Sequence, residues 1–161
     1  MTSQSDGGQR GLLELNRHES SYAYRLAHND WLPSVVRHSR VDLPGSVHAA
    51  SAARRGIVKQ FGEILTREEQ DMLRLLVSEL INNAVVHGGA DADHHVIFHL
   101  AVAPERIRAE VCDGGPGLDP GALPERKDSL GGRGFIILDG LASRWGVSTR
   151  DGTCVWFELD R

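Results

Sequence analysis

The sequence predicts a two-layer α/β (α+β) sandwich, in which helices cover one face of a mixed, mostly antiparallel sheet. Three observations lead to this fold class. Apolar residues recur at helical spacing within residues 73–84, and apolar residues alternate with others along residues 94–102. Near the C-terminus, Asp151-Gly152 separates two strand-like segments and predicts a hairpin. The chain therefore combines amphipathic helices with antiparallel strands.

The N-terminal half divides into a tail, a strand and two helices. Residues 1–30 are rich in Ser, Gly, Gln, Asn and His, so we expect a flexible N-terminal tail before a folded domain at residues 31–161. The first strand is expected within residues 31–43. One helix is expected at residues 46–61, with its first residue as the N-cap, and a second at residues 66–87, with acidic residues in its first turn.

The C-terminal half contains strands, one long loop and one helix. Alternation and turn residues mark the strands, and a cluster of Gly and Pro marks the loop. The expected elements are, in order, two strands at residues 94–102 and 106–113, a loop at 114–134, a helix at 135–142, and two strands at 144–149 and 153–159.

The composition indicates a globular domain that does not bind nucleic acid directly. Hydrophobic residues make up 40% of the chain and charged residues 25%, which suffices for one apolar core. Lys and Arg number 18 against 22 Asp and Glu, giving a net charge of -4 without the basic excess of a nucleic-acid binder. We see no secretory signal and no apolar stretch of membrane-spanning length, so we expect a cytoplasmic protein without a membrane partner.

The two cysteines lie far apart in the sequence. Cys112 and Cys154 each occur in an apolar, strand-like segment, and they do not form a C-x-x-C motif. We therefore expect two buried free thiols in a reducing compartment rather than a disulfide.

A polar stripe interrupts the second predicted helix. Glu79, Asn83 and His87 follow one another at intervals of four residues, so they lie on one helical face. Such a stripe is usually a solvated surface, but Asn82-Asn83 lowers helix propensity in mid-helix, which suggests a chemical role. An amide oxygen suits Mg²⁺, which commonly keeps waters and substrate phosphates as its other ligands.

Glycines flank the long predicted loop on both sides. Asp113 ends a strand and is followed by Gly114-Gly115-Pro116-Gly117, and Gly132-Arg133-Gly134 precedes the next helix. These segments could be ordinary surface turns. Alternatively they hinge a lid, in which glycine lets the backbone approach a ligand and the helix N-terminus faces phosphate.

Taken in order, these segments resemble the GHKL (Bergerat-fold) ATPase superfamily, and within it the actinobacterial anti-sigma-factor serine/threonine kinases. Residues 78–87 are similar to the N box of that family. Residues 113–117 and 132–134 resemble its two glycine boxes, and residues 152–159 resemble a closing strand. The resemblance covers the chain from about Pro44 onward and implies a Bergerat ATP-binding fold.

The resemblance also implies a role for each site residue. Asp113 would bind the adenine amino group with Thr153 nearby, Asn83 would ligate Mg²⁺, and Glu79 would be the general base. His87 would touch phosphate, and the glycines would shape the lid: Gly115, Gly117, Gly132 and Gly134. Because Asn82 stands where relatives often carry a small residue or Thr, the assignment of the metal to Asn83 rests on its four-residue spacing from Glu79.

Three functions remain open at this point. The first is an anti-sigma factor that uses ATP and Mg²⁺ to phosphorylate a serine of an anti-anti-sigma (STAS-type) partner. The second is a non-catalytic ATP-binding module that sequesters a sigma factor or another regulator. The third is a detached histidine-kinase domain, which we do not favour because His18-Glu19 lacks the rest of a phospho-acceptor motif. A homodimer is also compatible with the resemblance.

Overall fold

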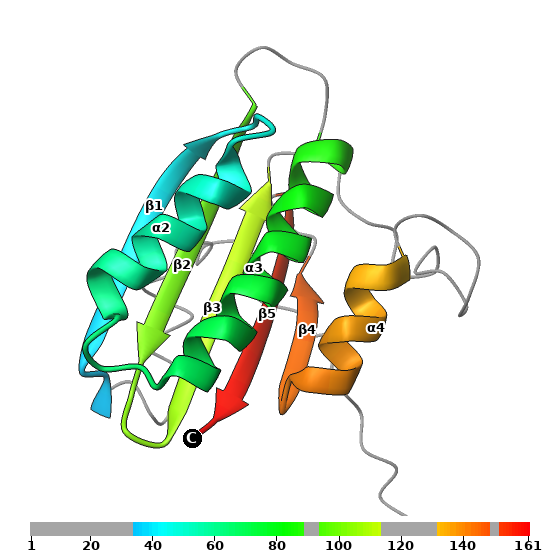
Figure 1. Ribbon diagram of the computed structural model, residues 1–161. Helices are drawn as coiled ribbons and strands as arrows, with labels where there is room; N and C mark the ends of the chain where they lie inside the picture. The colour runs from blue at the N-terminus through cyan, green and yellow to red at the C-terminus, as the bar shows by residue number, and fades with distance from the viewer. Residues whose placement is uncertain (1–33, 89–93, 114–131, 149–151) are drawn as a thin grey trace, which may run out of the picture.

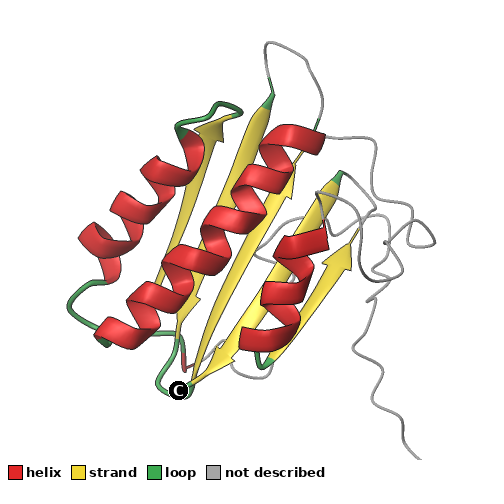
Figure 2. Cartoon of the chain, turned by 45° about the vertical axis from the view of Figure 1, so that its right-hand side comes forward, coloured by secondary structure: helices red, strands yellow, loops and turns green. Residues whose placement is uncertain are grey.

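Five strands form one antiparallel sheet, and the helices lie on one of its faces (Figures 1 and 2). The computed structural model describes residues 34–88, 94–113, 132–148 and 152–161, and the element count refers to these residues. The elements are β1 (Arg37–Pro44), α2 (Ala49–Phe61), α3 (Arg67–His87), β2 (His95–Val102), β3 (Arg106–Asp113), α4 (Gly132–Leu141), β4 (Arg144–Ser148) and β5 (Thr153–Asp160). The predicted fold class is therefore confirmed.

The order of strands across the sheet is β1-β2-β3-β5-β4. Each pair of neighbours within the described part of the chain is antiparallel. The sheet is thus wholly antiparallel there, whereas we had allowed for a mixed sheet. β5 follows β4 in sequence but lies between β3 and β4 in the sheet, so it pairs with both strands.

The core lies between the sheet and the helices. In α3, the apolar positions that predicted a helix are buried, namely Leu73, Leu76, Val77, Leu80, Ile81 and Ala84. They pack against alternate residues of the central strands, including Phe98, Val111 and Phe157. None of the helices within the described residues is long and apolar enough to cross a membrane.

The two predicted N-caps have different outcomes. The hydroxyl of Thr66 accepts a hydrogen bond from the Glu69 amide at 3.2 Å, and the Glu69 carboxylate accepts one from the Thr66 amide at 2.8 Å. This reciprocal capping box begins α3. The start of the helix at Thr66 is confirmed, and the return bond to the Glu69 carboxylate is a further finding. The prediction for Ser46 was wrong, because α2 begins at Ala49 and the Ser46 hydroxyl instead accepts a bond from the His48 amide at 3.3 Å.

The expectation of free thiols was also wrong. Cys112 and Cys154 form a disulfide across a sequence separation of 42 residues. The register of β3 against β5 places these residues directly opposite each other. Their pairing depends on that register, which the local sequence around each cysteine does not encode.

The face of the sheet opposite the helices, here called the outer face, carries buried charges. Side chains alternate along a strand, so Arg108 and Glu110 of β3 point away from the core residues Ala109 and Val111. Glu110 is fully buried, Arg108 is 6% exposed, and Glu158 of β5 is 4% exposed. Arg108 Nη1 donates a hydrogen bond of 2.8 Å to Glu158 Oε1, and Arg108 Nη2 lies 3.8 Å from Glu110 Oε2.

The cap of α3 should make stability depend on pH. Burial by itself raises the pKa of Glu69, but hydrogen bonds from Arg161 and from the Thr66 amide outweigh it and hold the pKa below its usual value. Because the pKa of Glu69 is lower in the folded than in the unfolded protein, its carboxylate stabilises the fold at any pH above the unfolded pKa, which is about 4.3. This stabilisation is lost as the pH falls through the folded-state pKa. Gln at this position keeps a capping oxygen but loses the charge paired with Arg161. We therefore expect Glu69→Gln to cost about 1 kcal/mol at pH 7, and the difference from wild type to shrink towards pH 3.

Urea unfolding of both proteins at the two pH values measures this difference. Glu68→Gln is the matched control, since Glu68 lies in the same first turn and has no part in the capping box. An equal cost of Glu69→Gln at pH 7 and pH 3 would contradict the proposed contribution of the carboxylate.

Candidate functional site

The polar stripe of α3 lies beside the buried face of that helix. Glu79 and Asn83 are partly buried, whereas Asn82 and His87 are exposed. This difference agrees with the choice of Asn83 over Asn82 as the inward-facing amide. His87 is the last residue of α3, so it lies at the C-terminal end of the helix.

The first turn of α4 rests directly on this stripe. A Cβ added to Gly134 would lie 2.7 Å from Nδ2 of Asn83 and 3.8 Å from Cβ of Glu79. Any larger residue at this position would have to displace the Asn83 amide or the helix itself. Gly134 therefore brings α4 against Asn83 and Glu79, which the sequence places about fifty residues away.

α4 begins earlier than predicted. The helix starts at Gly132 rather than at residue 135, so Gly132 and Gly134 belong to its first turn. Glycine is a poor helix former, which is why the sequence favoured a loop here. The free amides of this turn lie at a helix N-terminus, where the helix dipole favours anions such as phosphate.

The ends of two neighbouring strands form a second part of the site. Asp113 is the last residue of β3 and Thr153 the first of β5, and the two are partners in the strand register. The Thr153 amide donates a hydrogen bond of 3.4 Å to Asp113 Oδ1. Both side chains alternate with Cys112 and Cys154, so they point to the helix-covered face of the sheet, and Thr153 is only 7% exposed.

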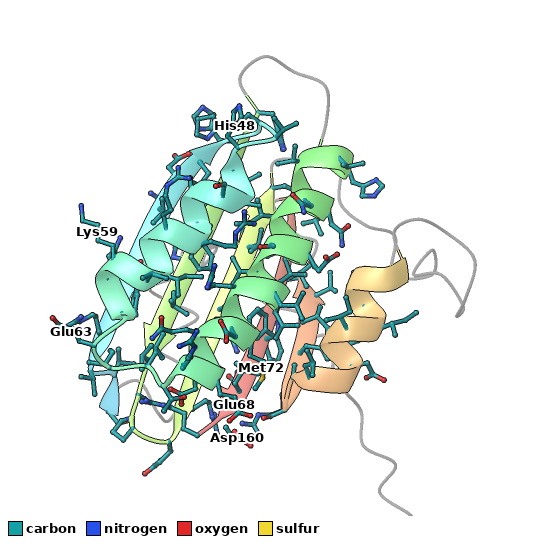
Figure 3. The ribbon with its side chains drawn as sticks, viewed as in Figure 1. His48, Lys59, Glu63, Glu68, Met72 and Asp160 are labelled. Atoms are coloured by element: carbon teal, nitrogen blue, oxygen red, sulfur yellow. A yellow bond between two sulfur atoms is a disulfide. The ribbon has the colours of Figure 1, made fainter. Side chains whose placement is uncertain are left out.

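Both parts lie at the same end of the molecule. In Figure 1 the end of β3, the beginning of β5, the beginning of α4 and the last turns of α3 all lie at the upper end. The first turn of α3 lies at the opposite end, where Glu69 pairs with Arg161 and where Figure 3 labels Glu68 and Asp160. The fold thus gathers Glu79, Asn83, Gly134, Asp113 and Thr153 toward one end of the sheet.

One residue that supports this end was not recognised in the sequence. We had assigned His94 only to the beginning of a strand. Its ring lies against both Gly45 and Gly88, where a Cβ on either glycine would overlap it, and its Nε2 lies 3.2 Å from the Ala84 carbonyl oxygen. His94 therefore fixes the C-terminal end of α3, and no signal in the local sequence indicates this contact between distant segments.

Several predicted site residues lie outside the described part of the chain. Gly115 and Gly117 fall within residues 114–131, so the first glycine box and the predicted lid are not placed. Residues 1–33, which include the predicted tail, also lie outside it. The described site therefore consists of the α3 stripe, the first turn of α4 and the strand ends.

The donor groups of this site suit a magnesium nucleotide. Asn83 offers an amide oxygen and Glu79 a carboxylate, which are the oxygen ligands that hard divalent cations prefer. The absence of a side chain at Gly134 lets the first turn of α4 approach the Asn83 amide this closely. Asp113 adds an acceptor, at the end of the sheet, for an amino group.

Comparison with known families identifies the domain. Residues 42–159 match the family model described as histidine kinase-like ATPase domain. The chain belongs to this family. The match includes the α3 stripe, both glycine segments and the closing strands, so the predicted superfamily is confirmed and the chain contains an ATP-binding domain of the histidine kinase-like type.

Solved structures of histidine kinases are similar to this ATPase domain. The blue-light activated histidine kinase EL346 of Erythrobacter litoralis is 27% identical, with a TM-score of 0.50 over 59% of this chain and 31% of that chain. Its histidine kinase domain, solved separately, is 28% identical, with a TM-score of 0.47 over 56% of this chain and 43% of that chain. The catalytic domain of histidine kinase ThkA is 14% identical, with a TM-score of 0.45 over 78% of this chain and 97% of that chain.

The histidine kinase-like ATPase described here spans less than half of each EL346 chain. None of the curated protein sequences compared with it matches significantly. The comparisons therefore establish the ATPase domain and leave its activity and partners to be proposed.

Proposed function

We propose that the protein is a cytoplasmic anti-sigma factor with serine/threonine kinase activity, which transfers the γ-phosphate of ATP to a hydroxyl of an anti-anti-sigma (STAS-type) partner. The observation that carries this proposal is the contact of Gly134 with Asn83 and Glu79. It puts the first turn of α4 beside the polar stripe, so Asn83 as metal ligand, Glu79 as base and the backbone amides of that turn as phosphate ligands would act close together.

The nucleotide would be bound at two points. Asp113, held by the Thr153 amide, would accept a hydrogen bond from the adenine amino group. Asn83 would hold the Mg²⁺ that neutralises the phosphates, while Gly132 and Gly134 would offer backbone amides to them. Positioning and charge neutralisation of this kind supply most of the catalysis in phosphoryl transfer.

Glu79 would activate the acceptor. It lies one helical turn before Asn83 on the same face of α3 and is partly buried. A carboxylate in that place can take the proton from a serine hydroxyl as the hydroxyl attacks the γ-phosphate. His87, exposed at the end of α3, is assigned a contact with phosphate.

The runner-up function uses the same nucleotide site without transfer. An ATP-binding module that sequesters a sigma factor would need Asp113 and Asn83 but not Glu79 as a base. The two functions differ in the fate of the γ-phosphate, so a phosphotransfer assay separates them.

Mg-ATP should stabilise the protein through Asp113. A ligand at about 100 times its Kd adds roughly 2.7 kcal/mol, which raises the Tm by roughly 5–11 °C. We expect Asp113→Asn to lose most of this shift. In the wild type, Asp113 Oδ1 accepts a hydrogen bond from the Thr153 amide and Oδ2 would accept one from the adenine amino group. In Asp113→Asn the side-chain oxygen would keep the bond to Thr153. The side-chain NH2 group, a donor, would then face the adenine amino group, which is also a donor.

Thermal melting with and without Mg-ATP tests this expectation. Asp71→Asn is the matched control, because the Asp71 side chain is exposed and lies in the first half of α3, away from the site. The control should keep the wild-type shift. If Asp113→Asn keeps it as well, Asp113 does not bind the base, and a wild type that shows no shift would contradict the proposed function.

A further inference from the structure

The disulfide lies directly beneath the strand ends assigned to the nucleotide base. Cys112 and Cys154 are register partners, and the next pair along the two strands is Asp113 with Thr153. The cysteines point to the outer face and the next pair to the helix-covered face, because neighbouring side chains alternate. One covalent bond therefore joins β3 to β5 at the register pair next to the base-binding pair.

We propose that Cys112 and Cys154 form a site of reversible thiol–disulfide exchange, whose substrate is a dithiol and whose oxidation state sets the affinity for the nucleotide. This inference rests on the proposed role of Asp113 and Thr153 in binding the base. It assigns a chemical function to the only two cysteines of the chain.

The position of the pair explains how it would act on the site. Asp113 ends β3 and Thr153 begins β5, so their pairing lies at the end of the ladder. Pairs at strand ends open at a lower free-energy cost than those in the middle of a sheet. The disulfide ties the adjacent positions covalently and so keeps Asp113 in register with the Thr153 amide.

The two cysteine residues differ in exposure. Cys112 is partly exposed, whereas Cys154 is 8% exposed. A thiolate of the dithiol attacks Sγ of Cys112, forming a mixed disulfide and releasing Cys154 as a thiolate that takes up a proton. The second thiol of the dithiol then attacks the first sulfur of the same dithiol, which is bonded to Cys112, and releases Cys112 as a thiolate that takes up a proton. Two electrons and two protons pass to the cysteines, and the dithiol becomes a disulfide.

Glu110 provides a partner for the reduced form. Its Oε1 lies 3.4 Å from Sγ of Cys112, and its Oε2 lies 3.8 Å from Nη2 of Arg108. A sulfur in the disulfide has no proton, but a Cys112 thiol can donate one to this buried carboxylate. The neighbouring guanidinium also disfavours a metal cation among Glu110, Cys112 and Cys154, although their ligand atoms lie within 4.8 Å of one another.

Nucleotide binding to the two redox forms of the wild-type protein tests the proposal. Thiols are first counted with a chromogenic disulfide reagent in denatured protein purified without reductant, and we expect none. Calorimetric titration with Mg-ATP then compares this form with protein reduced by dithiothreitol. We expect reduction to weaken binding by at least about fivefold, the lower range of coupling between linked sites.

A double variant and a reciprocal measurement complete the test. Cys112→Ser with Cys154→Ser should bind Mg-ATP as the reduced wild type does and should not respond to dithiothreitol. By linkage, Mg-ATP should shift the thiol–disulfide equilibrium of the wild type toward the disulfide by the same factor.

The contrary outcomes are distinct. Three results would overturn this inference and leave the proposed function standing. They are two free thiols in the unreduced protein, equal affinity of the two redox forms for Mg-ATP, and stoichiometric retention of Zn²⁺ by the reduced protein. Failure of both forms to bind Mg-ATP would overturn the proposed function, and this inference with it.

Discussion

Replacing Glu79 with Gln is expected to lower the rate of phosphoryl transfer to the partner serine by about 10²–10⁴-fold, the usual contribution of a general base. Gln keeps the size of the side chain but cannot accept the hydroxyl proton. Mg-ATP binding should remain, because Asn83 and Asp113 are unchanged and the contact of Gly134 with this part of α3 involves Cβ of residue 79.

The measurement uses γ-labelled ATP and recombinant STAS-domain proteins from the source organism, tested one at a time. Glu68→Gln is the control, since it makes the same chemical change in the first turn of α3, at the other end of the molecule (Figure 3). Undiminished transfer by Glu79→Gln would remove Glu79 from the mechanism. A STAS-domain protein or sigma factor that binds wild type but is never phosphorylated would favour the sequestering module.

Arg108→Ala is expected to cause the largest loss of stability, roughly 3–5 kcal/mol, because it removes one partner of a buried ion pair. The Arg108 side chain is 7% exposed and lies between Glu158 and Glu110. Its Cζ also lies 4.2 Å from the centre of the Trp156 ring. Without Arg108, two carboxylates would stay in a poorly solvated place with less compensating charge.

Urea unfolding of wild type and Arg108→Ala measures this cost. Arg144→Ala is the matched control, since Arg144 also donates a hydrogen bond to Glu158, at 2.8 Å, but its side chain is 43% exposed. We expect Arg144→Ala to cost less, about 1 kcal/mol, because Arg144 is largely solvated and Arg106 and Arg108 still face Glu158. If the two variants are equally stable, the burial of Arg108 does not determine how much its ion pairs contribute to the stability of the protein.

Features set by neighbouring residues in the chain were predictable from the sequence. The apolar spacing of α3 and its start at Thr66, with acidic residues in the first turn, depend on contacts within a few residues, and both were confirmed. The same holds for the alternation in β2 and the position of the last two strands. The stripe of Glu79 and Asn83 was visible for the same reason, because helical geometry alone places them on one face.

Features set by contacts between distant segments were not predictable. The Cys112–Cys154 bond and the Arg108–Glu158 pair both depend on the register of β3 against β5. The contact of Gly134 with Asn83 depends on how α4 packs against α3, and glycine spacing in the sequence carries no information about that packing. Only the structure could therefore show which polar residues share a space.

The place of β5 in the sheet also governs when the site can exist during synthesis. β4 is made before β5, yet among the described strands β5 is its only neighbour, and β3 lacks its second neighbour there until β5 is made. A nascent chain that stops short of Thr153 therefore exposes one edge of β3, leaves β4 detached and holds Asp113 without its partner amide. Truncated translation products would be substrates for quality-control proteases rather than competitors for nucleotide.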